Sequence, residues 1–109
     1  MNPKLLRGSL ETIVIKLLND NKEMYGYEIT QMVKDITAGE LKLTEGALYP
    51  TLHKLEAKGI LSVETKNIGN RYRKYYSLTK SGKKELKQQM SDMESYIANM
   101  ILLLQPKLD

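Results

Sequence analysis

Residues 44–59, TEGALYPTLHKLEAKG, decide how the rest of the chain is interpreted, because they predict one short helix from Thr44 to Lys58. Thr44 is a suitable N-cap, and Glu45 lies where the helix dipole favours a negative charge. Gly59 is a suitable C-terminal stop. One apolar stripe recurs at helical spacing and consists of Leu48, Leu52 and Leu55.

The face opposite this stripe carries small and polar residues: Gly46, Tyr49, Pro50, His53, Lys54 and Ala57. Such a face fits a DNA major groove. A solvated helix surface is the alternative, and these residues alone favour neither. Pro50 removes a backbone donor inside the helix, at a cost of about 3 kcal/mol if nothing relaxes. We therefore expect either a kink at Pro50 or a regular helix that begins later than Thr44.

Length and composition limit the classes of protein that this chain can be. Its 109 residues suit one small domain with an appended helix. The 17 Lys and Arg exceed the 13 Asp and Glu, and the net charge of +4 suits a polyanionic partner, although weakly. There is no cysteine, no apolar run of membrane-spanning length and no signal-peptide pattern, so we expect a cytoplasmic protein.

Two helices are predicted before residue 44. The first starts at Asn2-Pro3, continues through apolar positions from Leu10 to Leu18 and ends in the turn at residues 19–22. The second runs from about Tyr25 to Ile36. Amides at its start can hold a phosphate, which makes Tyr25 a candidate DNA contact, whereas packing on the core is the alternative. Residues 40–43 alternate like a very short strand.

After Gly59 the pattern changes to the alternation of a β-hairpin. Residues 61–66 predict one strand, residues 67–70 a turn and residues 72–78 the returning strand. Its tip is basic, with Lys66, Arg71, Arg73 and Lys74. From residue 58 to residue 87 there are nine basic residues and two acidic ones. Three helices and a basic hairpin predict an α+β, mostly helical fold, the winged helix-turn-helix.

A last helix is predicted from about Lys80 to Gln105, with Thr79 as its N-cap and Pro106 just beyond it. Its apolar positions follow the heptad spacing of a coiled coil: Leu86, Met90, Met93, Ile97, Met100 and Leu104. A small domain cannot cover a helix of about 25 residues, roughly 37 Å long. We expect homodimerisation through this stripe, and the alternative is a helix folded back on its own domain.

Three motifs make the chain resemble the PadR family of bacterial transcriptional regulators over nearly its whole length. The first is Tyr25-Gly26-Tyr27-Glu28-Ile29. The second is Gly46-Ala47-Leu48-Tyr49-Pro50, followed by Leu52, Leu55-Glu56, Lys58-Gly59 and Ile60-Leu61. The third is Arg71, Arg73-Lys74-Tyr75-Tyr76, Leu78-Thr79 and Gly82. The family also has a proline in the second motif, where Pro50 stands.

This resemblance implies a winged helix-turn-helix DNA-binding domain at residues 1–78 and a C-terminal dimerisation helix at residues 79–109. It also implies a repressor that binds a near-palindromic operator as a homodimer and is often released by a small-molecule effector. The recognition-helix contacts that it implies are Thr44, Glu45, Tyr49, Thr51, His53 and Lys54. The implied wing contacts are Lys66, Arg71, Arg73 and Lys74.

Two other classes of function compete with this hypothesis. A protein-binding winged helix would turn the same basic face to an acidic protein. An enzyme is not expected, because His53 is the only histidine and no Asp/Glu set has the spacing of metal ligands. We therefore predict neither a cofactor nor a metal site.

Overall fold

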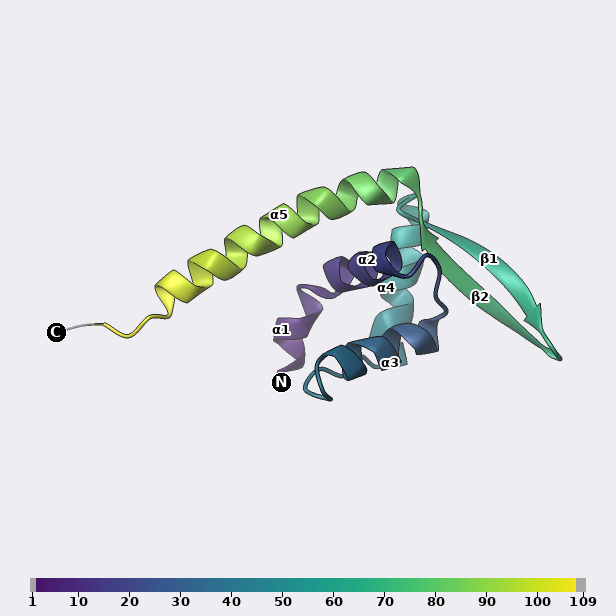
Figure 1. Ribbon diagram of the computed structural model, residues 1–109, viewed down its shortest axis with the longest axis horizontal. Coiled ribbons are helices and arrows are strands. Elements are labelled where there is room, and N and C mark those ends of the chain that lie inside the picture. The colour runs from purple at the N-terminus through teal and green to yellow at the C-terminus, as the bar shows by residue number, and fades with distance from the viewer. Residues whose placement is uncertain (1, 108–109) are drawn as a thin grey trace.

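The structure is a computed structural model that describes residues 2–107. Three helices, α2 (Leu10–Asp20), α3 (Gly26–Ile36) and α4 (Glu45–Ala57), pack together, and a short α1 (Pro3–Arg7) precedes them in the chain. A hairpin of β1 (Leu61–Ile68) and β2 (Arg71–Leu78) follows, and then α5 (Lys80–Leu103). The hairpin and α5 leave the helical core on opposite sides (Figure 1). The fold is the winged helix-turn-helix that the sequence predicts, with a long C-terminal helix.

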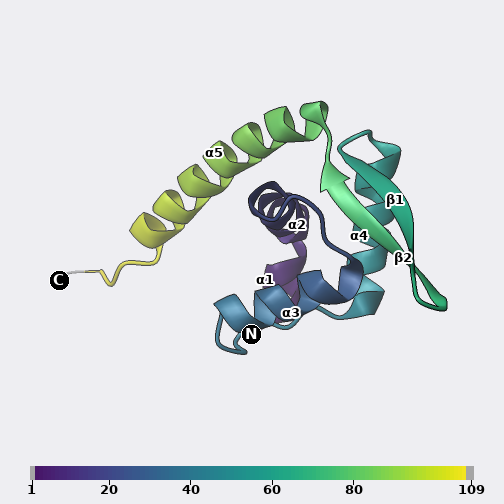
Figure 2. The ribbon, with the colours of Figure 1, turned by 45° about the vertical axis from the view of Figure 1, so that its right-hand side comes forward.

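One apolar core joins the three helices to the base of the hairpin. Its fully buried side chains come from every one of these elements and are Val14, Ile15, Leu18, Ile29, Leu48, Leu52, Leu55 and Tyr76. The three leucines of the predicted α4 stripe are all 0% exposed. This burial anchors one face of α4 and leaves its opposite face outward. Figure 2 shows α4 between the hairpin and the other helices.

The single N-terminal helix predicted from Pro3 onward is wrong, because the chain breaks it at Gly8 and Ser9. The amide of Ser9 and its hydroxyl both donate to the Leu6 carbonyl oxygen at 3.1 Å, which ends α1. Glycine also loses more backbone entropy in a helix than any other residue. No residue of α1 is buried, so α1 is a separate element at the edge of the core.

The short strand predicted at residues 40–43 is also wrong. This connection turns through positive φ angles at Ala38 and Gly39, and it buries Leu43 in the core without strand pairing. Met24 takes the place beside β2 instead, because its amide and carbonyl pair with those of Tyr76 at 3.0 and 2.8 Å. The start of α3 is thereby fixed to the wing.

The two wing strands are longer than predicted. They pair antiparallel from Leu61 opposite Leu78 to Ile68 opposite Arg71, which leaves only Gly69 and Asn70 in the turn. Gly69 has a φ of 66°, a left-handed conformation that glycine adopts without steric cost. The longer ladder adds two paired positions to β1 and carries the basic residues farther from the core.

Helix α5 begins directly after its N-cap Thr79, which follows the last residue of β2. The Thr79 hydroxyl accepts from the Gly82 amide at 3.0 Å and donates to the Gly59 carbonyl oxygen at 2.6 Å. Gly82 lies so close to β1 that a Cβ there would be 2.3 Å from the Ile60 carbonyl oxygen. Only glycine fits at this contact, which fixes the direction in which α5 leaves the domain.

We expect Gly82→Ala to destabilise the protein by about 1–3 kcal/mol, because a backbone atom must move to admit the methyl group. Gly8→Ala is the matched control, since a Cβ at Gly8 would meet nothing within 4 Å. Urea denaturation of the two variants measures the difference. A midpoint for Gly82→Ala equal to that of the wild type would contradict the close contact.

The two halves of α5 have different surroundings. In its first half, Leu86 is buried in the core, Met90 packs against that core, and the Thr12 hydroxyl donates to Gln89 Oε1 at 2.7 Å. Its second half exposes apolar side chains, so the alternative of a helix folded back on its own domain is wrong for this half. Leu86 belongs to the core of its own chain, which corrects its assignment to a dimer interface. Within residues 2–107 no helix meets the length and apolarity of a membrane span.

Candidate nucleic-acid interface

Helix α4 presents the face that the sequence predicts as the recognition surface. Thr44 is its N-cap, and the Thr44 hydroxyl accepts from the Ala47 amide at 3.2 Å. The side chains of Glu45, Tyr49 and His53 are exposed. These residues are four positions apart and therefore lie along one side of the helix. The Tyr49 and His53 rings are 6.4 Å apart between centroids.

Pro50 lies inside α4, and the helix runs through it from Glu45 to Ala57. The helix begins at Glu45, directly after its N-cap Thr44, so the expectation of a later start is wrong, whereas the alternative of a kink at Pro50 stays a prediction. The side chain of Pro50 is exposed. Thr51 is partly buried and its hydroxyl donates to the Ala47 carbonyl oxygen at 3.2 Å, so its polar atom is engaged with its own helix.

Lys54 lies at the edge of this face, next to α2. Its ammonium group is 3.4 Å from the Glu11 carboxylate, and Lys58 is 3.7 Å from the same carboxylate. The Lys54 side chain is still 59% exposed, and exposed ion pairs of this kind are weak. Lys54 is therefore exposed enough to contact a DNA phosphate. Because it lies at the edge of the α4 face, it is less suited to contact a base edge in front of that face.

Tyr49 packs on the start of α3. Gly26 leaves the space for this contact, because a Cβ there would be 2.7 Å from the Tyr49 hydroxyl oxygen and 3.0 Å from the ring. The Tyr49 side chain is 37% exposed, so one side of its ring rests on α3 and the other faces outward. Gly26 of the Tyr25–Ile29 motif thus leaves the space that Tyr49 of the Gly46–Pro50 motif occupies.

We expect Gly26→Ala to displace the Tyr49 ring and to weaken DNA binding about three- to tenfold, with a small loss of stability because the side chain is free to rotate away. Fluorescence anisotropy of a labelled operator measures the effect. Tyr49→Ala provides the control, since adding Gly26→Ala to it should change affinity by less than twofold. Equal effects of Gly26→Ala in both backgrounds would show that Tyr49 is not involved.

The wing brings the predicted basic residues together on both faces of one hairpin. Arg71 and Lys74 are exposed, whereas Lys66 and Arg73 are partly buried. Lys66 stands directly opposite Arg73 in the strand register, so these two side chains share a face. Lys74 is on the other face. All four cations lie within one short ladder beside α4 and α3.

Contacts between the wing and the start of α3 involve residues that the sequence did not predict. Lys66 donates to Glu23 Oε1, and its ammonium lies 4.7 Å from the centre of the Tyr75 ring. This hydrogen bond to Glu23 raises the pKa of Lys66 above its ordinary value. Tyr75 meets Tyr25 edge to face, with ring centroids 5.6 Å apart. No local pattern signals Glu23, because its partner is 43 residues away in the chain.

Tyr25 is held at the start of α3, where the Glu28 carboxylate accepts from its amide at 3.1 Å. The Arg73 guanidinium lies over its ring, 4.4 Å from the centroid. Tyr25 therefore packs against the wing. The two roles predicted for it from the sequence were phosphate binding and packing on the core. The predicted contacts Tyr25, Tyr49 and Arg73 come together around the start of α3.

The second half of α5, together with its C-cap Leu104, exposes a run of large apolar side chains. Its residues are 51–76% exposed and include Tyr96, Ile97, Ile101, Leu102, Leu103 and Leu104. Met93 and Met100 are partly exposed on the same helix. A cavity of about 730 Å³ lies beside this stripe, between α1, α2 and α5. A contiguous apolar surface of this kind marks an interaction site.

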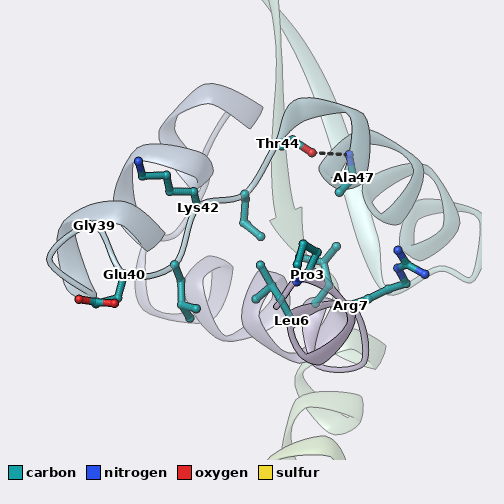
Figure 3. Close-up of a pocket in the computed structure, with 11 residues that line it drawn as sticks. Pro3, Leu6, Arg7, Gly39, Glu40, Lys42, Thr44 and Ala47 are labelled. Atoms are coloured by element: carbon teal, nitrogen blue, oxygen red, sulfur yellow. Dashed lines mark hydrogen bonds between the residues drawn. The ribbon is translucent and has the colours of Figure 1, made fainter. Parts of the chain in front are cut away.

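A second cavity, of about 600 Å³, lies between α1, the connection after α3 and the first turn of α4. Pro3 and Leu6 point into it, whereas Glu40 and Lys42 point outward (Figure 3). Arg7 lies near the start of α4. Among residues 2–107 there is no group of three His, Cys, Asp or Glu side chains that could hold a metal ion.

Comparison with known proteins gives a matching family model and relatives that cover most of this chain. The model of the transcriptional regulator PadR-like family matches residues 14–88. An uncharacterized protein of Lysinibacillus sphaericus is 32% identical over 85 residues, which are 77% of either chain. A transcriptional regulator of Mycobacterium tuberculosis is 31% identical over 88 residues, covering 81% of this chain and 78% of its own.

The comparison with solved structures also gives transcriptional regulators. A transcriptional regulator from Clostridium thermocellum superposes with a TM-score of 0.87 at 26% identity, over 94% of this chain and 99% of that one. Bacillus subtilis PadR in complex with operator DNA has a TM-score of 0.66 at 27% identity, over 92% of this chain and 49% of its own. The family and these named regulators are not enzymes. Together with the winged helix-turn-helix geometry, the match over residues 14–88 means that this chain belongs to the PadR-like family of transcriptional regulators.

Proposed function

We propose that this protein is a dimeric, sequence-specific DNA-binding repressor that acts in the cytoplasm. The observation that supports this most is the placement of α4: three leucines with no exposed area hold one face in the core, and Tyr49 and His53 face outward. A basic wing stands directly beside that face. The similar PadR of Bacillus subtilis was solved in complex with operator DNA, which supports DNA binding by this chain.

The proposed division of the chain follows residues 1–78 and 79–109. The first part would bind DNA and the second would dimerise, with residue 1 and residues 108–109 outside the described structure. Leu86 and Met90 serve the core, so the proposed interface is narrowed to Met93, Ile97, Met100 and Leu104 of the predicted set. The exposed Tyr96, Ile101 and Leu103, which flank these positions in the heptad, extend it.

In the proposed complex, the two α4 helices enter successive major grooves about 34 Å apart on a near-palindromic site. Glu45, Tyr49 and His53 approach base edges, while Thr44, Thr51 and Lys54 lie nearer the backbone. Arg71, Arg73 and Lys74 neutralise phosphates, which fix orientation without reading sequence. A small-molecule effector would release the operator only if it bound more tightly to a second arrangement of the α5 helices. In that arrangement the spacing of the two α4 helices would not match the two half-sites.

Hydroxyl-radical footprinting of the DNA upstream of the gene tests this proposal. Two protected segments related by a local twofold axis and centred about one helical turn apart are the expected result. Uniform weak protection of any duplex would instead favour the competing hypothesis, in which the basic face binds an acidic protein.

A further inference from the structure

From the contacts between the wing and the start of α3, here called the wing joint, we infer that Tyr25 is a positioning residue that presents the Arg73 guanidinium to a DNA phosphate. Lys66 then serves this joint and does not contact DNA. The inference rests on the proposed DNA-binding function. It separates the four wing cations into two roles, although the sequence treats them alike.

The joint is a continuous stack that runs from β1 to the start of α3. The Glu23 carboxylate holds Lys66, the Lys66 ammonium rests on Tyr75, and Tyr75 meets Tyr25 edge to face. Arg73 closes the stack over the Tyr25 ring. The backbone pairing of Met24 with Tyr76 fixes the same two segments. The stack therefore sets where the wing stands relative to α3 and α4.

Charge distinguishes the two cations that the stack contains. The Lys66 ammonium already has a carboxylate partner in Glu23, and its side chain is 34% exposed. Within residues 2–107, Arg73 lies in none of the four ion pairs. A guanidinium stacked on an aromatic ring keeps its N–H groups at the edge free to donate. Arg73 is therefore held in one orientation with its donors available to a phosphate.

Preorganisation of this kind improves affinity because less side-chain entropy is lost on binding. An exposed cation–π contact is worth roughly a twofold to fivefold change in affinity for each subunit. Tyr25→Leu removes the contact, whereas Tyr25→Phe keeps an aromatic face. The two variants thus separate stacking from any contact made by the hydroxyl group.

The test is a double-mutant cycle on operator affinity, measured by fluorescence anisotropy. We expect Tyr25→Leu to weaken binding about two- to fivefold per subunit and Tyr25→Phe to change it by less than twofold. In the Arg73→Ala background, Tyr25→Leu should add less than twofold. Additive losses would overturn the inference, because Tyr25 would then act without Arg73.

The Lys66 assignment is tested by the salt dependence of binding. Loss of one phosphate contact per subunit lowers the slope of log affinity against log salt by about 1.8 per dimer. We expect this decrease for Arg71→Met and an unchanged slope for Lys66→Met. A decrease for Lys66→Met equal to that for Arg71→Met would overturn its assignment to the joint.

A measurement without DNA keeps the inference separate from the proposed function. In proton NMR of the free protein, the side-chain protons of Arg73 should be shifted upfield by the Tyr25 ring current. Tyr25→Leu should abolish that shift and Tyr25→Phe should retain it, with circular dichroism confirming that both variants fold. Arg73 shifts that are insensitive to Tyr25→Leu would overturn the stack even if operator binding is intact.

Discussion

Ile97→Asp is expected to convert the protein to a monomer and to lower its operator affinity by at least about a hundredfold. Ile97 is 51% exposed in the single chain and lies in the middle of the α5 stripe. Twofold symmetry places two copies of each substitution in one interface. An unpaired carboxylate in an apolar contact is strongly unfavourable. Operator affinity falls with it, because two linked half-sites gain about 10²–10⁴ over one.

Ser95→Asp is the matched control for this experiment. Ser95 is exposed on the same helix, and by heptad spacing it lies away from the positions that Met93, Ile97 and Met100 occupy. It should remain dimeric and bind the operator within about twofold of the wild type. Sedimentation velocity reports the oligomeric state of both variants. A dimeric Ile97→Asp protein would mean that α5 is not the dimer interface.

Replacing both Arg71 and Arg73 by alanine is expected to weaken operator binding about 10- to 1000-fold at physiological salt. The double variant removes four phosphate contacts from a dimer, which should lower the slope of log affinity against log salt by about 3.6. Because phosphate contacts carry no sequence information, binding to non-specific duplex should weaken in parallel. The ratio of specific to non-specific affinity should therefore change little.

The control removes the same charge elsewhere. Lys84 and Lys87 are exposed on α5, and Lys84→Ala with Lys87→Ala should lower affinity only through the long-range field, by much less than the arginine pair. Anisotropy titrations at several salt concentrations measure both the affinity and the slope. Equal losses for the two double variants would mean that net charge, and not the wing, holds the DNA.

The sequence predicted most of this fold because its strongest patterns are local. Leu48, Leu52 and Leu55 at helical spacing place α4 correctly, and Thr44 and Thr79 mark the starts of α4 and α5. The alternation after Gly59 correctly predicts the hairpin. Pro50 led to the expectation of either a kink or a later helix start, and the later start is wrong because burial of the leucine stripe holds this segment in the helix.

The errors at residues 40–43 and at Leu86 have a common cause, which is that tertiary contacts outweigh local pattern, whereas the break at Gly8 and Ser9 is local. Residues 40–43 alternate like a strand but have no partner, since Met24 occupies the place beside Tyr76. Leu86 fits the heptad stripe equally well, yet α2 and the base of the wing bury it. The hydrogen bond between Lys66 and Glu23 joins residues that are 43 positions apart in the chain. No rule on local residue spacing predicts a contact over that separation.

The most direct test of the central claim is a titration of the protein against its own upstream DNA by fluorescence anisotropy at two salt concentrations, with sedimentation of the complex. We expect tight, site-selective binding by a dimer that weakens steeply as salt rises. Weak binding that is equal for every duplex, or site-selective binding by a monomer, would contradict it.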